Sequence, residues 1–143
     1  MEIKFRGKIK YNGNHRFSGD WVYGYYLYDQ NTEIHYIKES DDVDGLGTYI
    51  HDSFEVIPES VGQFTGLKDK NDVEIYHKDI VNAREQGKVS KIKHMQEVIF
   101  YYGCFMLAML PNKIRLRNIS ATFMENDVEV IGNTTDNPEL FEH

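Results

Sequence analysis

Six histidines and one cysteine are the side chains of this chain best suited to metal binding or nucleophilic chemistry. No two histidines stand at the i, i+4 spacing that would place both imidazoles on one face of a helix, and the single cysteine excludes a Cys-x-x-Cys site. The sequence therefore predicts no catalytic residues, no metal and no cofactor. Residues far apart in the sequence could still meet in the folded chain. The six histidines are His15, His35, His51, His77, His94 and His143.

Two short elements resemble parts of a catalytic site. His51 is followed by Asp52, which could orient the imidazole, but a catalytic pair also needs a nucleophile and a cleft. Cys104 has apolar and aromatic neighbours rather than the basic partner that activates a thiol, so we expect it to be a buried structural residue. A small enzyme whose His, Asp and Cys side chains converge in a cleft remains the alternative to a non-catalytic protein.

An acidic stretch, Asp41-Asp42-Val43-Asp44-Gly45, could suggest a calcium loop. An EF-hand loop that began at Asp42 would need a glutamate at its twelfth position, where this chain has Ser53. We therefore expect a solvated acidic loop.

Basic residues are concentrated in the second half of the chain. Between Asn82 and Asn118 there are seven basic residues and two acidic ones, a local charge of +5 in a chain whose net charge is −7, so the remainder carries −12. Alternation along strands would place these cations on common faces, where they could meet phosphates. The candidate nucleic-acid-binding residues of this 84–117 stripe are Lys91, Lys93, Lys113, Arg115 and Arg117. Solvated strand faces would also explain them.

Self-association is a further possibility, because the charges are segregated. The region Ile119–His143 holds six acidic residues and no Lys or Arg. A contact between the basic stripe of one copy and this acidic region of the next would repeat head to tail and can close into a ring. We therefore expect a homo-oligomer, with nucleic acid or another protein as possible further partners.

The elements that would position these residues are mainly β-strands. Ten Tyr and eight Phe residues favour pleated, half-buried surfaces. The clearest strand is Trp21–Tyr28, where Trp21, Tyr23 and Tyr25 share one face and Gly24 suits a close backbone approach. The other expected strands are Glu2–Phe5, Glu33–Ile37, Thr48–Ile50, Phe54–Ile57, Glu74–Tyr76, one beginning at Asp79, Val89–His94, Glu97–Tyr102, Phe105–Leu110, Lys113–Leu116 and Asp127–Ile131.

Two short helical turns interrupt the predicted strands. Pro58 can begin a turn that reaches Phe64 and is closed by Gly66, and Pro138 can begin a terminal one over 138–142. The expected organisation of this single 1–143 chain is an N-terminal β lobe (1–57), a connecting helical turn (58–66) and a C-terminal lobe (67–143) with an acidic tail. The Asp79-Ile80-Val81 start suggests, by analogy, that the second lobe is a small SH3-like barrel.

Several segments resemble one known family. The run Val61–Val81 (VGQFTGLKDKNDVEIYHKDIV) is similar to the signature of the YopX-like family of bacteriophage and prophage proteins. The stretches Ile3–Arg6 and Trp21–Tyr26 and the C-terminal Val128–Leu140 are also similar to it, so the resemblance spans nearly the whole chain. It implies a mostly β fold, no established activity and higher homo-oligomers.

The chain departs from that family pattern at two turns. Asp72 stands where the family usually has the glycine of an Asn-Gly turn, and His77-Lys78 precedes Asp79 where an acidic residue and glycine are common. Both departures concern local turn geometry.

The expected function is that of a non-catalytic phage or prophage accessory protein that acts as an oligomeric binding module and not as an enzyme. The alternatives are a nucleic-acid-binding regulator that uses the 84–117 stripe and the small enzyme described above. The charged N-terminus predicts no signal peptide, and the longest apolar run, Val98–Leu110, is too short to span a bilayer. We therefore expect a cytoplasmic location in the bacterial host and no membrane partner.

Overall fold

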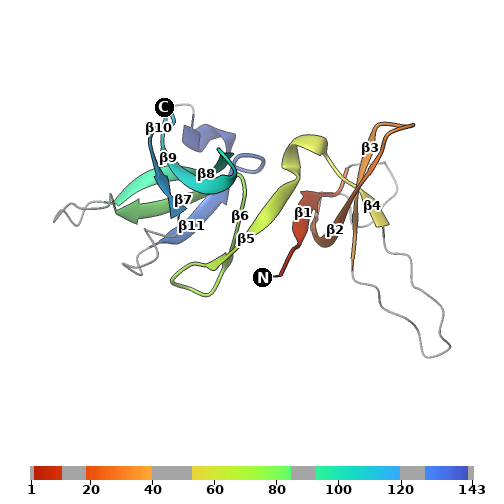
Figure 1. The fold of residues 1–143 in the computed structure, drawn as a ribbon, viewed down its shortest axis with the longest axis horizontal. Coiled ribbons are helices and arrows are strands. Elements are labelled where there is room, and N and C mark those ends of the chain that lie inside the picture. Colours follow the sequence, from red (N-terminus) through yellow and green to blue (C-terminus); the bar gives the residue numbers. More distant parts are fainter. Residues whose placement is uncertain (1, 11–18, 40–52, 85–92, 120–127, 142–143) are drawn as a thin grey trace. The chain divides into compact units, whose positions relative to one another are not determined.

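A computed structural model describes residues 2–10, 19–39, 53–84, 93–119 and 128–141, and in these ranges the chain is mainly β (Figure 1). Two antiparallel sheets hold the strands. Two short 3-10 turns, η1 (Pro58–Ser60) and η2 (Pro138–Phe141), are the described helical elements. The predicted fold class is therefore confirmed.

The first sheet has six strands in the order β4-β3-β2-β1-β5-β6. Its strands are β1 (Phe5–Lys8), β2 (Trp21–Asp29), β3 (Ile34–Lys38), β4 (Ser53–Glu55), β5 (Gly62–Lys68) and β6 (Glu74–Tyr76). The second sheet has five strands in the order β10-β9-β8-β7-β11. They are β7 (Asp79–Arg84), β8 (Lys93–Tyr101), β9 (Cys104–Met109), β10 (Ile114–Asn118) and β11 (Glu129–Asn133).

The chain forms two compact units, Met1–Gln63 and Phe64–His143. Strand β5 runs across the boundary between them. Its first residues pair with β1, at Gly62 and Gln63, and its later residues pair with β6, at Phe64 and Lys68. Each unit has its own core.

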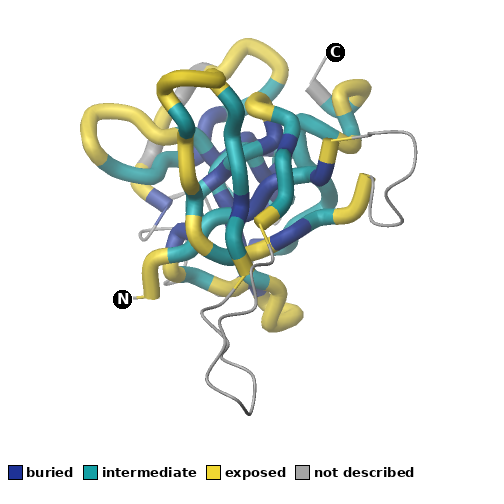
Figure 2. Tube along the Cα trace, turned by 90° about the vertical axis from the view of Figure 1, so that its right-hand side faces the viewer, coloured by how far each residue is buried: buried dark blue, intermediate teal, exposed yellow. Residues whose placement is uncertain are grey.

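The core of the first unit comes from the alternation of its strands. Ile9, Val22, Ile37 and Val56 are almost completely buried, and Phe5 and Tyr26 are among the half-buried rings that pack against them. Figure 2 shows the same division along the chain, with buried segments in the strands and exposed residues in the turns. Because successive strand residues point to opposite faces, this core also determines which residues lie on the other face.

Strand β2 changes its pairing partner at Gly24. Residues 21–24 pair with β1, and residues 25–29 pair with β3, where Tyr25 lies opposite Lys38. At this point the backbone of β3 comes so close that a Cβ on Gly24 would lie 2.0 Å from the carbonyl oxygen of Lys38. The sequence correctly predicted a close backbone approach at Gly24, and the structure shows that the approaching strand is β3.

The core of the second unit lies against the five-stranded sheet. It contains Ile75, Val81, Ala83, Val98, Leu107, Ile119 and Val128, all buried. The expected SH3-like barrel is not what the described strands form: β10 and β11 occupy the two edges of an open sheet. The expectation of a closed barrel was therefore wrong for the described part of this unit.

The connecting helical turn is also shorter than predicted. It ends at Ser60, and residues 62–68 form β5 instead of continuing the turn to Phe64. Gly66 does not close a helix but takes a φ of +87° inside the strand, where the β5–β6 register shifts between Phe64 and Lys68. Such a shift is the mark of a β-bulge, which glycine accommodates. The terminal turn, in contrast, begins at Pro138 as predicted.

The predicted strands agree with the structure to different degrees. Glu74–Tyr76 agrees at both ends, whereas the first strand begins at Phe5 and not at Glu2. Glu97–Tyr102 was expected as a separate strand, but β8 runs without a break from Lys93 to Tyr101. The expected strand Thr48–Ile50 lies outside the described residues.

Both departures from the family pattern fall at left-handed backbone positions. Asp72 has a φ of +66° and Lys78 a φ of +75°. The backbone bonds of these turns are nevertheless formed, because the Asp72 amide donates to the Asp69 carbonyl at 3.0 Å and the Lys78 amide to the Val98 carbonyl at 2.8 Å. Both turns therefore form without glycine. Each does so at the steric cost of placing the Cβ of an L-residue in the left-handed region of backbone conformation.

This steric cost predicts a stabilising substitution. Lys78→Gly should raise the free energy of unfolding by about 0.5–1 kcal/mol, because the relief of left-handed strain exceeds the entropy gained by the unfolded chain. Lys78→Ala is the control, since it also shortens the side chain but keeps the Cβ and should bring no gain. Urea unfolding of the three proteins measures the difference, and a Gly variant less stable than the Ala variant would contradict the expectation.

Candidate functional site

The first sheet has a face that is turned away from its core and is both basic and aromatic. On β1, Phe5 and Ile9 belong to the core, so Arg6 and Lys8 lie on the opposite face. The same alternation continues to either side, to Lys4 and Lys10. Four basic residues, Lys4, Arg6, Lys8 and Lys10, therefore lie on the same face of the sheet at every second position along β1 and its flanking residues.

Strand β2 supplies the aromatic residues of this face. Val22 and Tyr26 contribute to the core, so Tyr23, Tyr25 and Leu27 point away from it. Their exposed fractions are 45%, 50% and 47%, which is high for large apolar side chains on a strand. Alternate strand residues recur about every 6.6 Å, so the two tyrosine rings form a row along β2.

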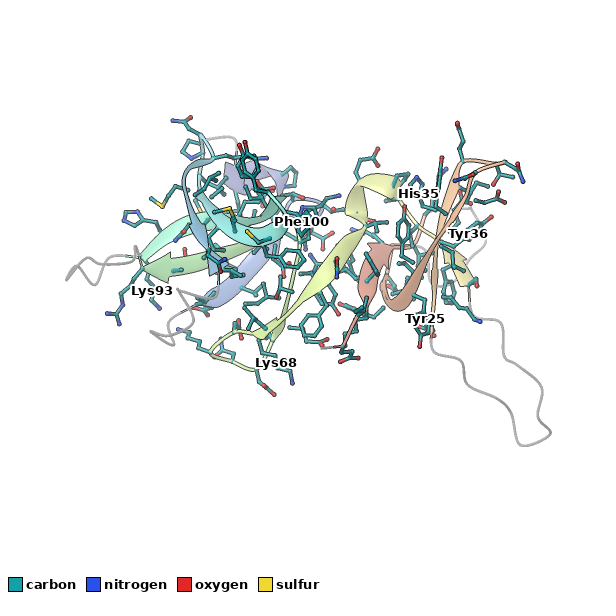
Figure 3. All side chains as sticks on the ribbon, in the orientation of Figure 1. Tyr25, His35, Tyr36, Lys68, Lys93 and Phe100 are labelled. Carbon is teal, nitrogen blue, oxygen red and sulfur yellow. The ribbon has the colours of Figure 1, made fainter. Side chains whose placement is uncertain are left out.

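The register brings the two kinds of residue together. Arg6 lies opposite Tyr23 and Lys8 opposite Trp21, while on the other side Tyr25 lies opposite Lys38 and Leu27 opposite Tyr36. Figure 3 shows Tyr25 and Tyr36 on these neighbouring strands. We call this surface the outer face, and its residues are Lys4, Arg6, Lys8, Trp21, Tyr23, Tyr25, Leu27, Tyr36 and Lys38.

Burial divides the outer face into a fixed part and an accessible part. Arg6 is buried and holds its guanidinium 4.6 Å from the centre of the Trp21 ring, a cation–π contact that fixes both side chains. Beside Tyr23 and Tyr25 there is an open hollow of about 290 Å³, lined by these two tyrosines, Gly24 and residues 2–4. Two carboxylates lie near the cations, since Glu2 is 3.6 Å from Lys4 and Glu55 is 3.4 Å from Lys10.

His35 lies on the opposite face of the same sheet. Its Nδ1 is hydrogen-bonded to the hydroxyl of Tyr26, and its ring is 4.7 Å from that of Tyr28. Burial, and to a smaller extent the proximity of Tyr28, raise the pKa of Tyr26 above its ordinary value. The contacts of His35 are therefore with tyrosines, which is the arrangement of a packed histidine rather than of a catalytic base.

The hairpin that joins β8 to β9 carries a second exposed aromatic group. Phe100, Tyr101 and Tyr102 are 54%, 44% and 88% exposed, and Tyr102 sits in the turn with a φ of +48°. Cys104 follows this turn, is only partly buried, and donates from Sγ to the carbonyl of Tyr101 at 3.4 Å. The expectation of a buried thiol was therefore wrong. The β8–β9 turn lies directly before Cys104 and places this residue at the end of the hairpin.

The predicted basic stripe is divided among separate places. Lys93 begins β8, at the end opposite Phe100 (Figure 3), and lies across from Arg84 on β7. Lys113 lies in the turn before β10, where its Nζ is 2.9 Å from Oε2 of the buried Glu97. Arg115 and Arg117 belong to β10, which β9 separates from β8. Lys91 lies outside the described residues.

The acidic C-terminal region already makes contacts within its own unit. Glu129 is 3.2 Å from Nζ of Lys70 on the exposed side of β11, and Asp136 accepts a hydrogen bond from Asn133. These are surface contacts, which another charged partner could replace at small cost.

The described histidines lie on three different elements. His35, His77 and His94 lie on β3, in the β6–β7 turn and on β8, and the described ranges contain no group of three or more His, Cys, Asp and Glu that could hold a metal ion. His15, His51 with Asp52, and the acidic loop 41–45 are outside these ranges. The convergence that the enzyme alternative requires is thus not seen in the described part of the chain.

Sequence reasoning recognised the aromatic row of β2 but missed the outer face. The missing signal was the alternation Lys4, Arg6, Lys8, Lys10, which has the period of a strand. Only the pairing of β1 with β2 shows that this basic row lies beside the aromatic one.

Comparisons with known proteins identify relatives of the whole chain. A family model described as YopX protein matches residues 4–142. The crystal structure of protein EF1440 from Enterococcus faecalis is similar to this fold, with a TM-score of 0.56, 23% identity and 99% of each chain covered. No curated protein matches. Within the described residues, no helix is long and apolar enough to cross a membrane.

Proposed function

The chain belongs to the YopX protein family, and from this premise we propose that it is a non-catalytic accessory protein of a bacteriophage or prophage. It would act in the cytoplasm of the bacterial host as a homo-oligomeric binding module whose further partners are nucleic acid or a phage or host protein. The described residues support binding more than catalysis, because their exposed aromatic surfaces are extensive and their histidines are scattered.

The observation that carries the oligomeric part of this proposal is the aromatic tip of the β8–β9 hairpin. Tyr102 is 88% exposed and occupies a left-handed turn position, where a small polar residue would be less strained. Phe100 packs edge-on against Phe105, so the tip is a preformed aromatic surface and not a set of separate side chains. Clustered exposed aromatic residues of this kind mark protein contact sites.

The charge distribution supports the same proposal. Arg84, Lys93 and Lys113 lie in the second unit, whose C-terminal segment carries Glu129, Asp136 and Glu139. Oppositely charged surfaces on one chain are complementary between two copies and steer them together.

Static light scattering of the full chain in moderate and in high salt tests the assembly. We expect a mass of at least two chains in moderate salt, and a lower mass for the variant Phe100→Ser/Tyr102→Asn, because the double substitution removes the two most exposed of the three rings at the tip while Asn tolerates the left-handed turn. A monomer in both salt conditions would reject the oligomer.

A matched control removes an exposed aromatic residue elsewhere. Tyr28→Ala lies in the first unit and has 47% exposure in the wild-type chain, so it should leave the mass unchanged. If it lowers the mass as much as the hairpin variant does, the contact is not specific to the β8–β9 tip.

The second candidate function is that of a nucleic-acid-binding regulator using the 84–117 stripe. It is favoured by one feature, the placement of Arg84 opposite Lys93, which brings two cations side by side on neighbouring strands where one phosphate could lie against both. Salt-sensitive retention on oligonucleotides that is weakened by Arg115→Glu with Arg117→Glu would support it, and no retention at low salt would remove it.

A further inference from the structure

We propose that the outer face of the first sheet binds single-stranded nucleic acid, with bases stacked on Tyr23 and Tyr25. The phosphates would lie beside the cations that border these rings, Lys4, Lys8 and Lys38. The inference rests on the proposed binding function, names its ligand class and places it on a different surface from the 84–117 stripe.

The aromatic row is the first argument. Tyr23 and Tyr25 expose about half of their surface and stand two residues apart on a strand, where the pleat keeps their rings on one side. Any base has a π-face, so such rings can stack on successive bases without regard to sequence. The neighbouring β3 adds Tyr36, opposite Leu27, at the border of the same surface.

The residues that flank the tyrosine row are basic, which favours a nucleic acid over an apolar peptide as the ligand. A surface for an apolar peptide would be flanked by apolar residues, whereas here Lys8 lies opposite Trp21 on one side and Lys38 opposite Tyr25 on the other. Cations on both sides of an aromatic row complement a chain that has bases at its centre and phosphates at its edge. The chain as a whole has a charge of −7, so this is a local site and not a generally basic surface.

The nearby carboxylates do not prevent phosphate binding. Glu2 and Glu55 lie 3.6 Å and 3.4 Å from Lys4 and Lys10; the Lys10–Glu55 pair is exposed on both sides, and half-buried Lys4 is paired with an exposed Glu2. Exposed ion pairs contribute about 0–1 kcal/mol, so a phosphate can compete with them. Arg6 is already fixed on the Trp21 ring and serves to hold that ring in place.

The hollow beside the tyrosines gives the site a defined size. Its volume of about 290 Å³ and its lining by Tyr23, Tyr25, Gly24 and residues 2–4 leave room for a planar ring against the tyrosines. Gly24, which stands between the two tyrosines in the sequence, is one of the lining residues. The same residue is the point at which β2 passes from β1 to β3, so the pairing that builds the sheet also positions the site.

Fluorescence anisotropy with a labelled oligothymidylate of about 20 nucleotides tests the proposal, since this length exceeds the roughly 4–16 nucleotides that one OB fold covers. We expect binding that weakens about 20-fold between about 50 and 200 mM salt if three phosphates are neutralised. Tyr23→Ala/Tyr25→Ala should weaken binding by about 10-fold or more for each lost stacking contact. The same oligonucleotide in duplex form should bind more weakly, because its bases are not available for stacking.

Three control variants separate the site from the fold. Tyr23→Phe/Tyr25→Phe keeps the rings and should bind like the wild type, whereas Tyr28→Ala removes an equally exposed ring from the other face and should leave binding unchanged. Lys4→Gln should reduce the slope of log affinity against log salt by about 0.7. Thermal unfolding of each variant shows whether the sheet is intact.

The proposal is overturned if the wild-type chain does not bind at low salt, or if the alanine pair binds as well as the wild type while Arg84→Glu/Lys93→Glu abolishes binding. Oligonucleotide binding that is insensitive to salt would exclude phosphate contacts with the lysines and would also overturn it. Light scattering keeps the two proposals distinct, because Tyr23→Ala/Tyr25→Ala should lose the oligonucleotide without changing its oligomeric mass.

Discussion

Gly24→Ala should lower the free energy of unfolding of the first unit by about 3 kcal/mol, with a fall of roughly 12–24 °C in its melting temperature. The added Cβ would lie 2.0 Å from the Lys38 carbonyl oxygen and 2.9 Å from its carbonyl carbon. These are backbone atoms, which cannot turn aside as a side chain can, so β2 and β3 must separate where the pairing changes. Thermal and urea unfolding followed by circular dichroism measure the loss.

A glycine in open space provides the control for this substitution. Gly19 precedes β2 and has a φ of +84°, but a Cβ built on it would meet nothing within 4 Å. Gly19→Ala should therefore show only left-handed strain, about 1 kcal/mol. Equal losses for the two variants would mean that backbone conformation, and not the approach of β3, determines the requirement for Gly24.

The same substitution connects the fold to the proposed binding site. Gly24 lies between Tyr23 and Tyr25, and a displaced β2 would no longer hold both rings beside Lys38. Gly24→Ala should consequently weaken oligonucleotide binding although it removes no aromatic or basic group. A protein that is destabilised but binds normally would show that the rings do not depend on the strand geometry.

The sequence predicted best those elements whose pattern is local. The predicted strand Trp21–Tyr28 is found as β2, which continues to Asp29, and the register agrees that Trp21, Tyr23 and Tyr25 share one face. Glu74–Tyr76 is bounded on both sides by turn residues, and its ends were therefore predicted correctly. Local alternation is a strong signal because it reflects the geometry of a single strand.

Elements that depend on partners were predicted less well. Pro58 does begin a helical turn, but pairing with β1 and β6 draws residues 62–68 into a strand. Gly66 is compatible with a helix end or with a bulge, and only the partner strand decides between them. The prediction of an SH3-like barrel was wrong for a related reason. Alternation within a strand does not indicate whether the two edge strands of a sheet pair with each other.

The candidate sites show the same limitation. The stripe from Arg84 to Arg117 comes from one stretch of sequence, which has no Lys or Arg between Lys93 and Lys113, and β9 lies between the strands that carry Lys93 and Arg117. The outer face joins residues of β1 and β2 that are separated by a segment outside the described ranges, and no pattern within either strand indicates their pairing. Strand order is a property of the fold, so a site that spans several strands is seen only in the structure.

Asp69→Ala should lower the free energy of unfolding of the second unit by about 3 kcal/mol. The Asp69 carboxylate is buried and accepts three backbone hydrogen bonds, from Asn71 at 2.8 Å, Val73 at 2.9 Å and Val130 at 2.9 Å. The first two close the β5–β6 turn, and the third attaches that turn to β11. Removing the acceptor leaves amide groups that must find water or remain unsatisfied, at about 1–3 kcal/mol for a buried group.

Two further variants identify which part of the Asp69 carboxylate matters. Asp69→Asn keeps one acceptor oxygen for the turn but presents an amide donor to the Val130 N–H, so we expect roughly half the loss and faster hydrogen exchange at Val130 than at Val73. Asp72→Asn removes a charge from the same turn, where Asp72 is exposed and 3.6 Å from Lys68, and should change stability by less than about 0.5 kcal/mol. If Asp69→Ala were no more harmful than Asp72→Asn, the turn would not depend on its buried acceptor, and the geometry of this hairpin would have to come from its backbone bonds alone.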